Sequence, residues 1–179
     1  MDRSVCARLP SFSFVCFSDA GQLVQDTHLM DTAAAASIVF TTALTLAFDW
    51  IPTSLNRNIL YSSTQDRLLS SLVHGTLGVI LATSLFFHLH WAALISATWF
   101  TIILVSAAVN WWLPYVFGVY WGEITVETYM IEFSDNLTLL APLHKDNVIV
   151  PDVQHTLLHT SAVLSLTTSV AVLVNLLST

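Results

Sequence analysis

The chain has 179 residues, of which 55% are hydrophobic and only 9% are charged, and its mean hydropathy is +0.71. An ordinary soluble domain has about 25% charged residues, so the composition excludes a soluble fold and indicates an integral, multi-pass membrane protein. Lys and Arg together number 5, Asp and Glu number 12, and the net charge is −7. So few basic residues exclude a nucleic-acid-binding surface and a polybasic lipid-binding patch.

Residues 1–31 are predicted to form a tail. They mix charged residues with a short apolar run from Phe12 to Phe17, which is far shorter than the roughly 20 residues that a spanning helix needs. The transmembrane domain is then expected to comprise residues 32–179.

Two spans are predicted in the first half of the chain. The first is expected at 32–50, where Asp31 and Asp49 bound an uncharged stretch. The second is expected at 68–88, after a polar connection. Both stretches are long enough to cross a bilayer as helices.

The third span, expected at 91–112, follows the second almost directly, so the two helices must form a tight antiparallel hairpin. His88 and His90 lie at its turn, on the same side as the N-terminus, and we expect them to be away from every other polar cluster. Pro114 is expected to stop or kink the third helix.

A long connection precedes the fourth span, which is expected at 156–177. Within this connection, apolar residues recur at helical spacing with acidic residues between them, which predicts a short amphipathic helix on the membrane surface. The apolar residues are Val126, Tyr129, Met130, Phe133 and Leu137. The predicted fold is therefore an all-α membrane protein, a bundle of four transmembrane helices with a short amphipathic helix in the loop before the last span.

Four spans bring several polar side chains to one face of the membrane. The ends of the first and third spans and the starts of the second and fourth meet there, because successive spans alternate in direction. His144 can approach this face from the long connection. The predicted catalytic residues of this face are Asp49, His74, Asn110, Tyr115, Glu123, His155 and His159.

His155 and His159 are four residues apart, so they share one helix face and could bind a metal ion together. His74 could add a third ligand, or pair with His159 as the axial ligands of a haem. The glutamate of the zinc-protease signature is missing, so we assign no metal, and the cofactor stays unknown. The other interpretations are a proton donor or acceptor without metal and half-solvated imidazoles at the headgroups.

Asp49 closes the first span, where an ionisable group is costly unless it meets water, a cavity or a partner. It either ionises freely at the interface or pairs with His74. Such a pair would be an acid–base couple that opens onto an apolar pocket within the bundle. Asn110 and Tyr115 would then orient a carbonyl or hydroxyl group of a substrate.

The segment from Asn110 to Gly118 reads Asn-Trp-Trp-Leu-Pro-Tyr-Val-Phe-Gly. Further along the chain come Tyr129, Phe133, Leu140, Pro142, Pro151, Asp152, His155 and His159. This pattern resembles a group of small microbial membrane proteins, in which a Trp-Trp-x-Pro-Tyr end to helix three precedes a Tyr and Phe helix, a proline-containing loop and a His-bearing last helix. The resemblance covers the C-terminal part of the chain. It implies the four-helix layout and a loop that belongs to the fold, and it implies no particular activity.

The sequence favours a membrane-embedded enzyme that acts on a lipophilic small molecule of quinone, terpenoid or polyketide type by acid–base or redox chemistry. The alternative is a non-catalytic accessory or assembly subunit of a membrane complex, which the short chain and the aromatic loop favour. A transporter or channel ranks last, because no span carries an acidic or basic residue in its middle and no pseudo-symmetric halves appear. The expected partners are the lipid bilayer, a lipophilic small molecule, and a membrane protein or a second copy of the chain.

Overall fold

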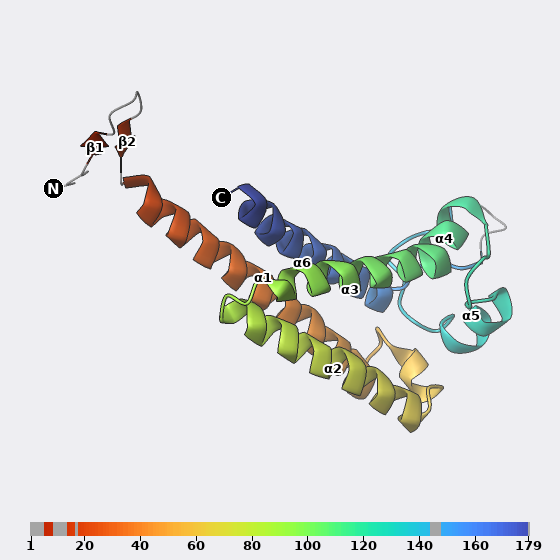
Figure 1. Ribbon diagram of the computed structural model, residues 1–179. Coiled ribbons are helices and arrows are strands. Elements are labelled where there is room, and N and C mark those ends of the chain that lie inside the picture. Colours follow the sequence, from red (N-terminus) through yellow and green to blue (C-terminus); the bar gives the residue numbers. More distant parts are fainter. Residues whose placement is uncertain (1–5, 9–13, 17, 144–147, 179) are drawn as a thin grey trace.

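The structure, a computed structural model, describes residues 6–8, 14–16, 18–143 and 148–178. Residues 1–5, 9–13 and 17 of the predicted tail and His144 lie outside the described residues. β1 and β2 pair as antiparallel strands, and the remaining elements are helical. In chain order (Figure 1), the elements are β1 (Cys6–Arg8), β2 (Phe14–Cys16), α1 (Ser18–Trp50), the 3-10 helix η1 (Arg57–Leu60), α2 (Thr64–Phe86), α3 (Trp91–Ala107), the π-helical segment η2 (Ala108–Trp112), α4 (Leu113–Phe117), α5 (Val126–Glu132) and α6 (Val153–Ser178).

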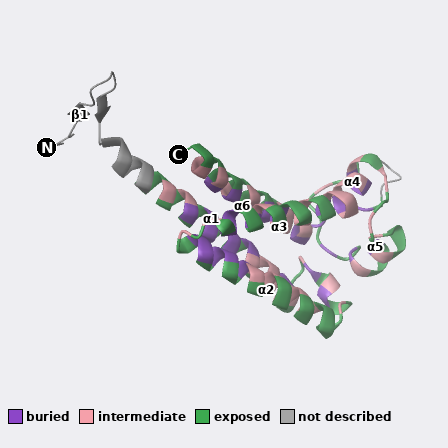
Figure 2. Cartoon of the chain, viewed as in Figure 1, coloured by how far each residue is buried: buried purple, intermediate pink, exposed green. Residues whose placement is uncertain are grey.

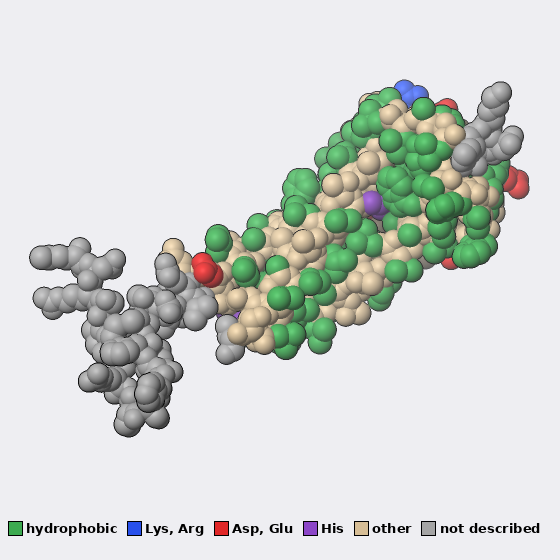
Figure 3. All heavy atoms as spheres, turned by 90° about the horizontal axis from the view of Figure 1, so that it is seen from above, with side chains coloured by type: hydrophobic (Ala, Val, Ile, Leu, Met, Phe, Trp, Pro, Cys, Tyr) green, Lys and Arg blue, Asp and Glu red, His purple; other side chains and the backbone are tan. Residues whose placement is uncertain are grey.

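Four helical segments are long and apolar enough to cross a membrane: Gln25–Trp50, Thr64–Phe86, Trp91–Phe117 and Val153–Ser178. This confirms the predicted helical class with four candidate spans. Figure 3 shows Lys, Arg, Asp and Glu side chains towards the ends of the visible surface, and mostly hydrophobic or uncharged side chains between them. Large apolar side chains in the spans, such as Leu72, Val79 and Ile102, are exposed, as expected of groups whose solvent is lipid.

The first helix begins well before the predicted span. α1 starts at Ser18, so the helix begins within residues 1–31, the region predicted as a tail. Backbone hydrogen bonds hold a helix together whatever the polarity of its side chains, and hydropathy therefore marks only the part of α1 that is apolar. As a result, Asp31 lies within a continuous helix, and its side chain is fully buried.

The third span is also longer than predicted. Of the two outcomes expected for Pro114, the stop is excluded, because the helix continues to Phe117. Proline cannot donate a hydrogen bond to the carbonyl four residues earlier, and the π-helical segment η2 lies directly before this position, where it can absorb the altered hydrogen-bond register. Gly118 follows the last helical residue, and its φ of 65° is left-handed, a conformation that glycine adopts without strain.

α1 packs against both α2 and α6, and α3 packs against α6. Figure 2 shows the buried residues concentrated where these helices meet. Between α1 and α6, the hydroxyl oxygens of Ser37 and Thr168 lie 2.8 Å apart, and those of Thr41 and Ser165 lie 2.9 Å apart. Such pairs satisfy buried hydroxyl groups where no water is present.

The predicted short helix in the last connection is confirmed as α5. Its apolar stripe does not form a single lipid-facing surface, however. Tyr129 and Phe133 are buried and pack edge-on against the Trp111 ring, whereas Val126 and Met130 are exposed. α5 therefore closes a small second core at the end of the third span.

Candidate functional site

A cavity of about 240 Å³ lies between the spans and contains three of the predicted site residues. Asp49 comes from the end of α1, His74 from α2 and His159 from α6. The other lining residues are mainly apolar or carry hydroxyl groups: Ile38, Thr41, Thr42, Thr45, Ser70, Gly78, Leu81, Trp99, Phe100, Ile103, Leu158 and Ala162. We call this space the central cavity.

A second cavity of about 440 Å³ adjoins the central cavity, because His74, Ile103 and His159 line both. Asn110 and Glu123 also line this second cavity, which we call the loop-side cavity. Five of the seven predicted site residues thus line two neighbouring cavities. Tyr115 and His155 line neither.

Asp49 has its own hydrogen-bond partners. Its Oδ2 accepts a hydrogen bond from Ser71 Oγ at 3.0 Å, and Trp50 Nε1 donates to the same hydroxyl at 2.7 Å. No hydrogen bond or ion pair joins Asp49 directly to His74 among the described residues. The two side chains nevertheless line the same cavity, so the carboxylate can act on the imidazole through its charge.

His74 makes a ring contact with Trp99, with 5.5 Å between the ring centroids. Within the described part of the chain, neither of its ring nitrogens has a hydrogen-bond partner. Its imidazole is therefore available to a ligand in either cavity.

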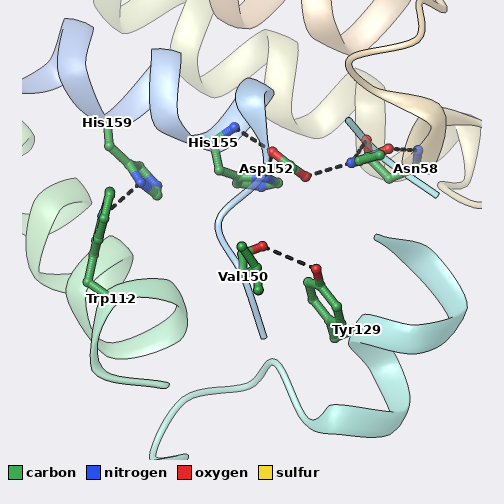
Figure 4. Close-up of polar contacts among 8 residues, drawn as sticks. Asn58, Trp112, Tyr129, Val150, Asp152, His155 and His159 are labelled. Atoms are coloured by element: carbon green, nitrogen blue, oxygen red, sulfur yellow. Dashed lines mark hydrogen bonds and ion pairs between the residues drawn. The ribbon is translucent and has the colours of Figure 1, made fainter. Parts of the chain in front are cut away.

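His159 is fixed by the end of the third span (Figure 4). Trp112 Nε1 donates a hydrogen bond to His159 Nδ1 at 3.2 Å. Because an indole nitrogen can only donate, Nδ1 must be the unprotonated nitrogen, and the neutral ring carries its proton on Nε2. The contact thus selects one tautomer of a histidine that lines both cavities.

His155 is built into the protein interior instead. Its Nδ1 lies 2.8 Å from Asp152 Oδ1, and its ring stacks on Trp111 with 3.8 Å between centroids. The rings of His155 and His159 are 5.9 Å apart. Although these histidines share a helix, their surroundings differ, and only His159 reaches the cavities.

Asp152 organises this interior, a role that the sequence reasoning missed. Its carboxylate is fully buried, accepts a hydrogen bond from the backbone N–H of His155 at 2.8 Å, and accepts another from Asn136 Nδ2 at 2.6 Å. Asn136 in turn contacts Asn58 in the connection before α2. An aspartate directly before a helix is the sequence signal of an N-cap and could have shown this role.

Asn110 and Tyr115 make structural contacts. Asn110 Oδ1 accepts a hydrogen bond from the backbone N–H of Glu123 at 2.8 Å, which ties the loop to the third span. A Cβ atom added at Gly122 would collide with the Asn110 side chain, so glycine is needed for this approach. Tyr115 donates its hydroxyl to the carbonyl of Ala141 at 3.0 Å.

The interpretation in which three side chains hold a metal ion finds no matching ligand cluster. No group of three or more His, Cys, Asp and Glu side chains that could hold a metal ion occurs among the described residues.

The prediction that His88 and His90 lie apart from other polar groups is wrong. His88 Nδ1 is 2.6 Å from Asp31 Oδ2, and His28 Nδ1 is 2.7 Å from His88 Nε2. The hairpin turn therefore carries a second polar cluster at the opposite end of the bundle. The hydropathy pattern did not predict this cluster, because that pattern placed His28 and Asp31 in the tail.

Comparison with known proteins gave no match. No family model, no curated protein and no solved structure matched this chain. The resemblance to small microbial membrane proteins therefore stays a prediction.

Proposed function

We propose that this protein is a membrane-embedded enzyme that acts on a lipophilic small molecule by proton transfer. One observation carries the proposal: His74 and His159 line two adjoining cavities, and the Asp49 carboxylate lines the central cavity with them. Apolar pockets with a few convergent ionisable groups are typical of sites for small molecules. Imidazole and carboxylate are acid–base groups, which favours proton transfer over the redox alternative.

The two histidines have different roles. His159 holds its proton on Nε2, because Nδ1 accepts from Trp112, so it can donate a hydrogen bond to a substrate oxygen on which negative charge develops. His74 is the proton acceptor. The Asp49 carboxylate then stabilises the imidazolium that forms at His74.

The cavity lining indicates the kind of substrate. Ile38, Leu81, Phe100 and Ile103 offer apolar contacts, and threonine hydroxyls lie among them. A molecule with an apolar body and a carbonyl or hydroxyl group fits this lining, as quinones, terpenoids and polyketides do. A C–H bond next to the carbonyl would be the proton source for His74.

The test is deuterium incorporation by the whole protein. The protein would be placed in nanodiscs made from the lipid extract of its expression host and incubated in D₂O. The lipophilic molecules would then be extracted and analysed by mass spectrometry. The wild type should place deuterium on carbon in one class of molecule. His74→Gln should lower this rate about 100-fold or more, because a positioned base contributes on that order.

A matched pair of acidic residues supplies the control. Asp49→Asn should slow the exchange, whereas Asp135→Asn should not, because Asp135 is exposed and outside both cavities. Equal exchange in the wild type and His74→Gln, or none in any sample, contradicts the proposal.

The accessory-subunit alternative has one supporting observation. Trp121 and Leu139 lie beyond the ends of the candidate spans and are 77% and 75% exposed. Apolar side chains in such positions suit contact with a partner protein. Under this alternative, Trp121→Ser would abolish co-purification of a membrane protein partner, and His74→Gln would leave it unchanged.

A further inference from the structure

A fully buried carboxylate lies at the end of the bundle opposite the two cavities. The Asp31 side chain is 0% exposed and belongs to a candidate span. Its Oδ2 lies 2.6 Å from His88 Nδ1, whereas no described residue forms a hydrogen bond with its Oδ1, which is also buried. A buried carboxylate oxygen without a hydrogen-bond partner carries a free-energy cost.

Two hydrogen bonds in series connect this carboxylate to the protein surface. His88 is 38% exposed, and its second ring nitrogen, Nε2, lies 2.7 Å from Nδ1 of His28, which is exposed. His88 therefore contacts the buried acid with one nitrogen and an exposed imidazole with the other. An imidazole that is bonded at both nitrogens can accept a proton at one and release a proton from the other.

His88 also occupies an unusual backbone conformation. Its φ is 57°, and among the described residues it is the one non-glycine position with positive φ. This left-handed region costs a residue with a Cβ atom free energy. The two short contacts of its side chain offset that cost and hold the ring between Asp31 and His28.

One further titratable group contacts Asp31. His90 Nε2 is buried and lies 3.4 Å from Asp31 Oδ2, without the geometry of a hydrogen bond. α6, which packs against α1, has no titratable side chain after His159. Asp31 therefore contacts His88 and His90 directly, and His28 is connected to Asp31 through His88.

We propose that His28, His88 and Asp31 form a proton relay that loads a buried carboxylate from the water on the N-terminal side of the membrane. Protonated His28 gives its Nδ1 proton to His88 Nε2, and His88 gives its own Nδ1 proton to Asp31 Oδ2. His28 and His88 are then neutral, and Asp31 is a carboxylic acid. When the pH rises, the protons return along the same two bonds.

The test follows the protonation of Asp31 in the full chain reconstituted in lipid nanodiscs. After a rapid step from about pH 8 to about pH 5, which spans the ordinary pKa of imidazole, infrared difference spectra should show a C=O stretching band of a carboxylic acid. Asp31→Asn should remove this band. His28→Gln should keep its final amplitude but slow its appearance by about tenfold or more, because the first carrier is lost.

Asp26→Asn is the matched control, since Asp26 is an exposed acid on the same helix and its replacement should leave the Asp31 band and its rate unchanged. If His28→Gln does not fold, as judged by circular dichroism, His88→Gln takes its place, with the same slowing expected. A band that forms at the wild-type rate in the folded histidine variant overturns the relay. A wild-type spectrum that lacks any band lost in Asp31→Asn overturns it as well.

Discussion

The indole N–H of Trp112 donates to Nδ1 of His159 across 3.2 Å, and this contact links the end of the third span to α6. It determines which nitrogen of His159 carries the proton in the neutral ring. A ring with its proton on Nε2 is a donor towards a ligand, and the other tautomer is not. The tautomer of a histidine in the central cavity therefore depends on a residue that does not line that cavity.

Trp112→Phe tests this dependence. The ring keeps its aromatic character but loses the N–H, so His159 should become a mixture of tautomers. Nitrogen NMR of protein labelled with ¹⁵N-histidine should show one tautomer for His159 in the wild type and two in the variant. The free energy of unfolding should fall by about 1 kcal/mol, the usual contribution of one hydrogen bond. An unchanged His159 spectrum would contradict the assigned donor.

Asp152→Ala should be among the most destabilising single changes outside the central cavity. It removes the N-cap of α6, the shorter of the two hydrogen bonds made by the buried Asn136 amide, and the contact with the His155 ring. A lost cap and unsatisfied buried groups together cost on the order of 3 kcal/mol. Thermal unfolding in detergent should show a clearly lower Tm, whereas Asp135→Ala, at an exposed site, should keep the wild-type Tm.

Two glycines of α2 form a matched pair for the packing of α1 on α2. A Cβ atom at Gly78 would lie 3.0 Å from Cβ of Thr42 and even closer to its hydroxyl, whereas at Gly75 the nearest atom would be Leu46 Cδ2 at 3.6 Å. Gly78→Ala should therefore destabilise the protein by about 1 to 3 kcal/mol through overpacking. Gly75→Ala should be neutral or stabilising by up to about 1 kcal/mol, because alanine favours the helix. Equal Tm values for the two variants would show that the helices can move apart without cost.

Tyr129 should make the stability of the protein depend on pH in the alkaline range. Burial raises the pKa of Tyr129 above its ordinary value, and the nearby Asp152 carboxylate adds to the increase. The unfolded chain therefore loses this proton first, at about pH 10, and the free energy of unfolding falls as the pH rises from there towards the pKa of the folded state.

Tyr129→Phe should remove this contribution. The variant loses the hydrogen bond to the Val150 carbonyl, so it should be less stable than the wild type at about pH 8 by about 1 kcal/mol. Between about pH 8 and about pH 11, its Tm should fall less than that of the wild type. Parallel curves for the two proteins would exclude a role for this hydroxyl.

The sequence predicted the number and type of the spans because hydropathy is a local property. The uncharged stretches that begin near Leu68, Trp91 and Thr156 correspond to α2, α3 and α6, with ends that differ by a few residues. The start of α1 was missed for the same reason: polar residues interrupt the apolar ones between Ser18 and Asp31, and a helix can continue through them.

Part of the candidate site was also predictable. Alternating spans bring Asp49, His74 and His159 to one face whatever the details of packing, and these three residues line one cavity. The sequence could not distinguish His159 from His155, because both lie on the same helix face. Their difference comes from Trp112, Trp111 and Asp152, whose positions depend on how the last connection folds over the end of the third span.

Composition and hydropathy alone thus determined a helical protein with four candidate spans and a polar face at one end, since each of these depends on residues that are near one another in the chain. Only the tertiary structure decided that Asp31 meets His88, 57 residues further along. Such a contact depends on the length of α1, on the turn that joins α2 and α3, and on the packing of α1 against α2. None of these is encoded in a single stretch of sequence, because each arises from the fit of side chains on different helices.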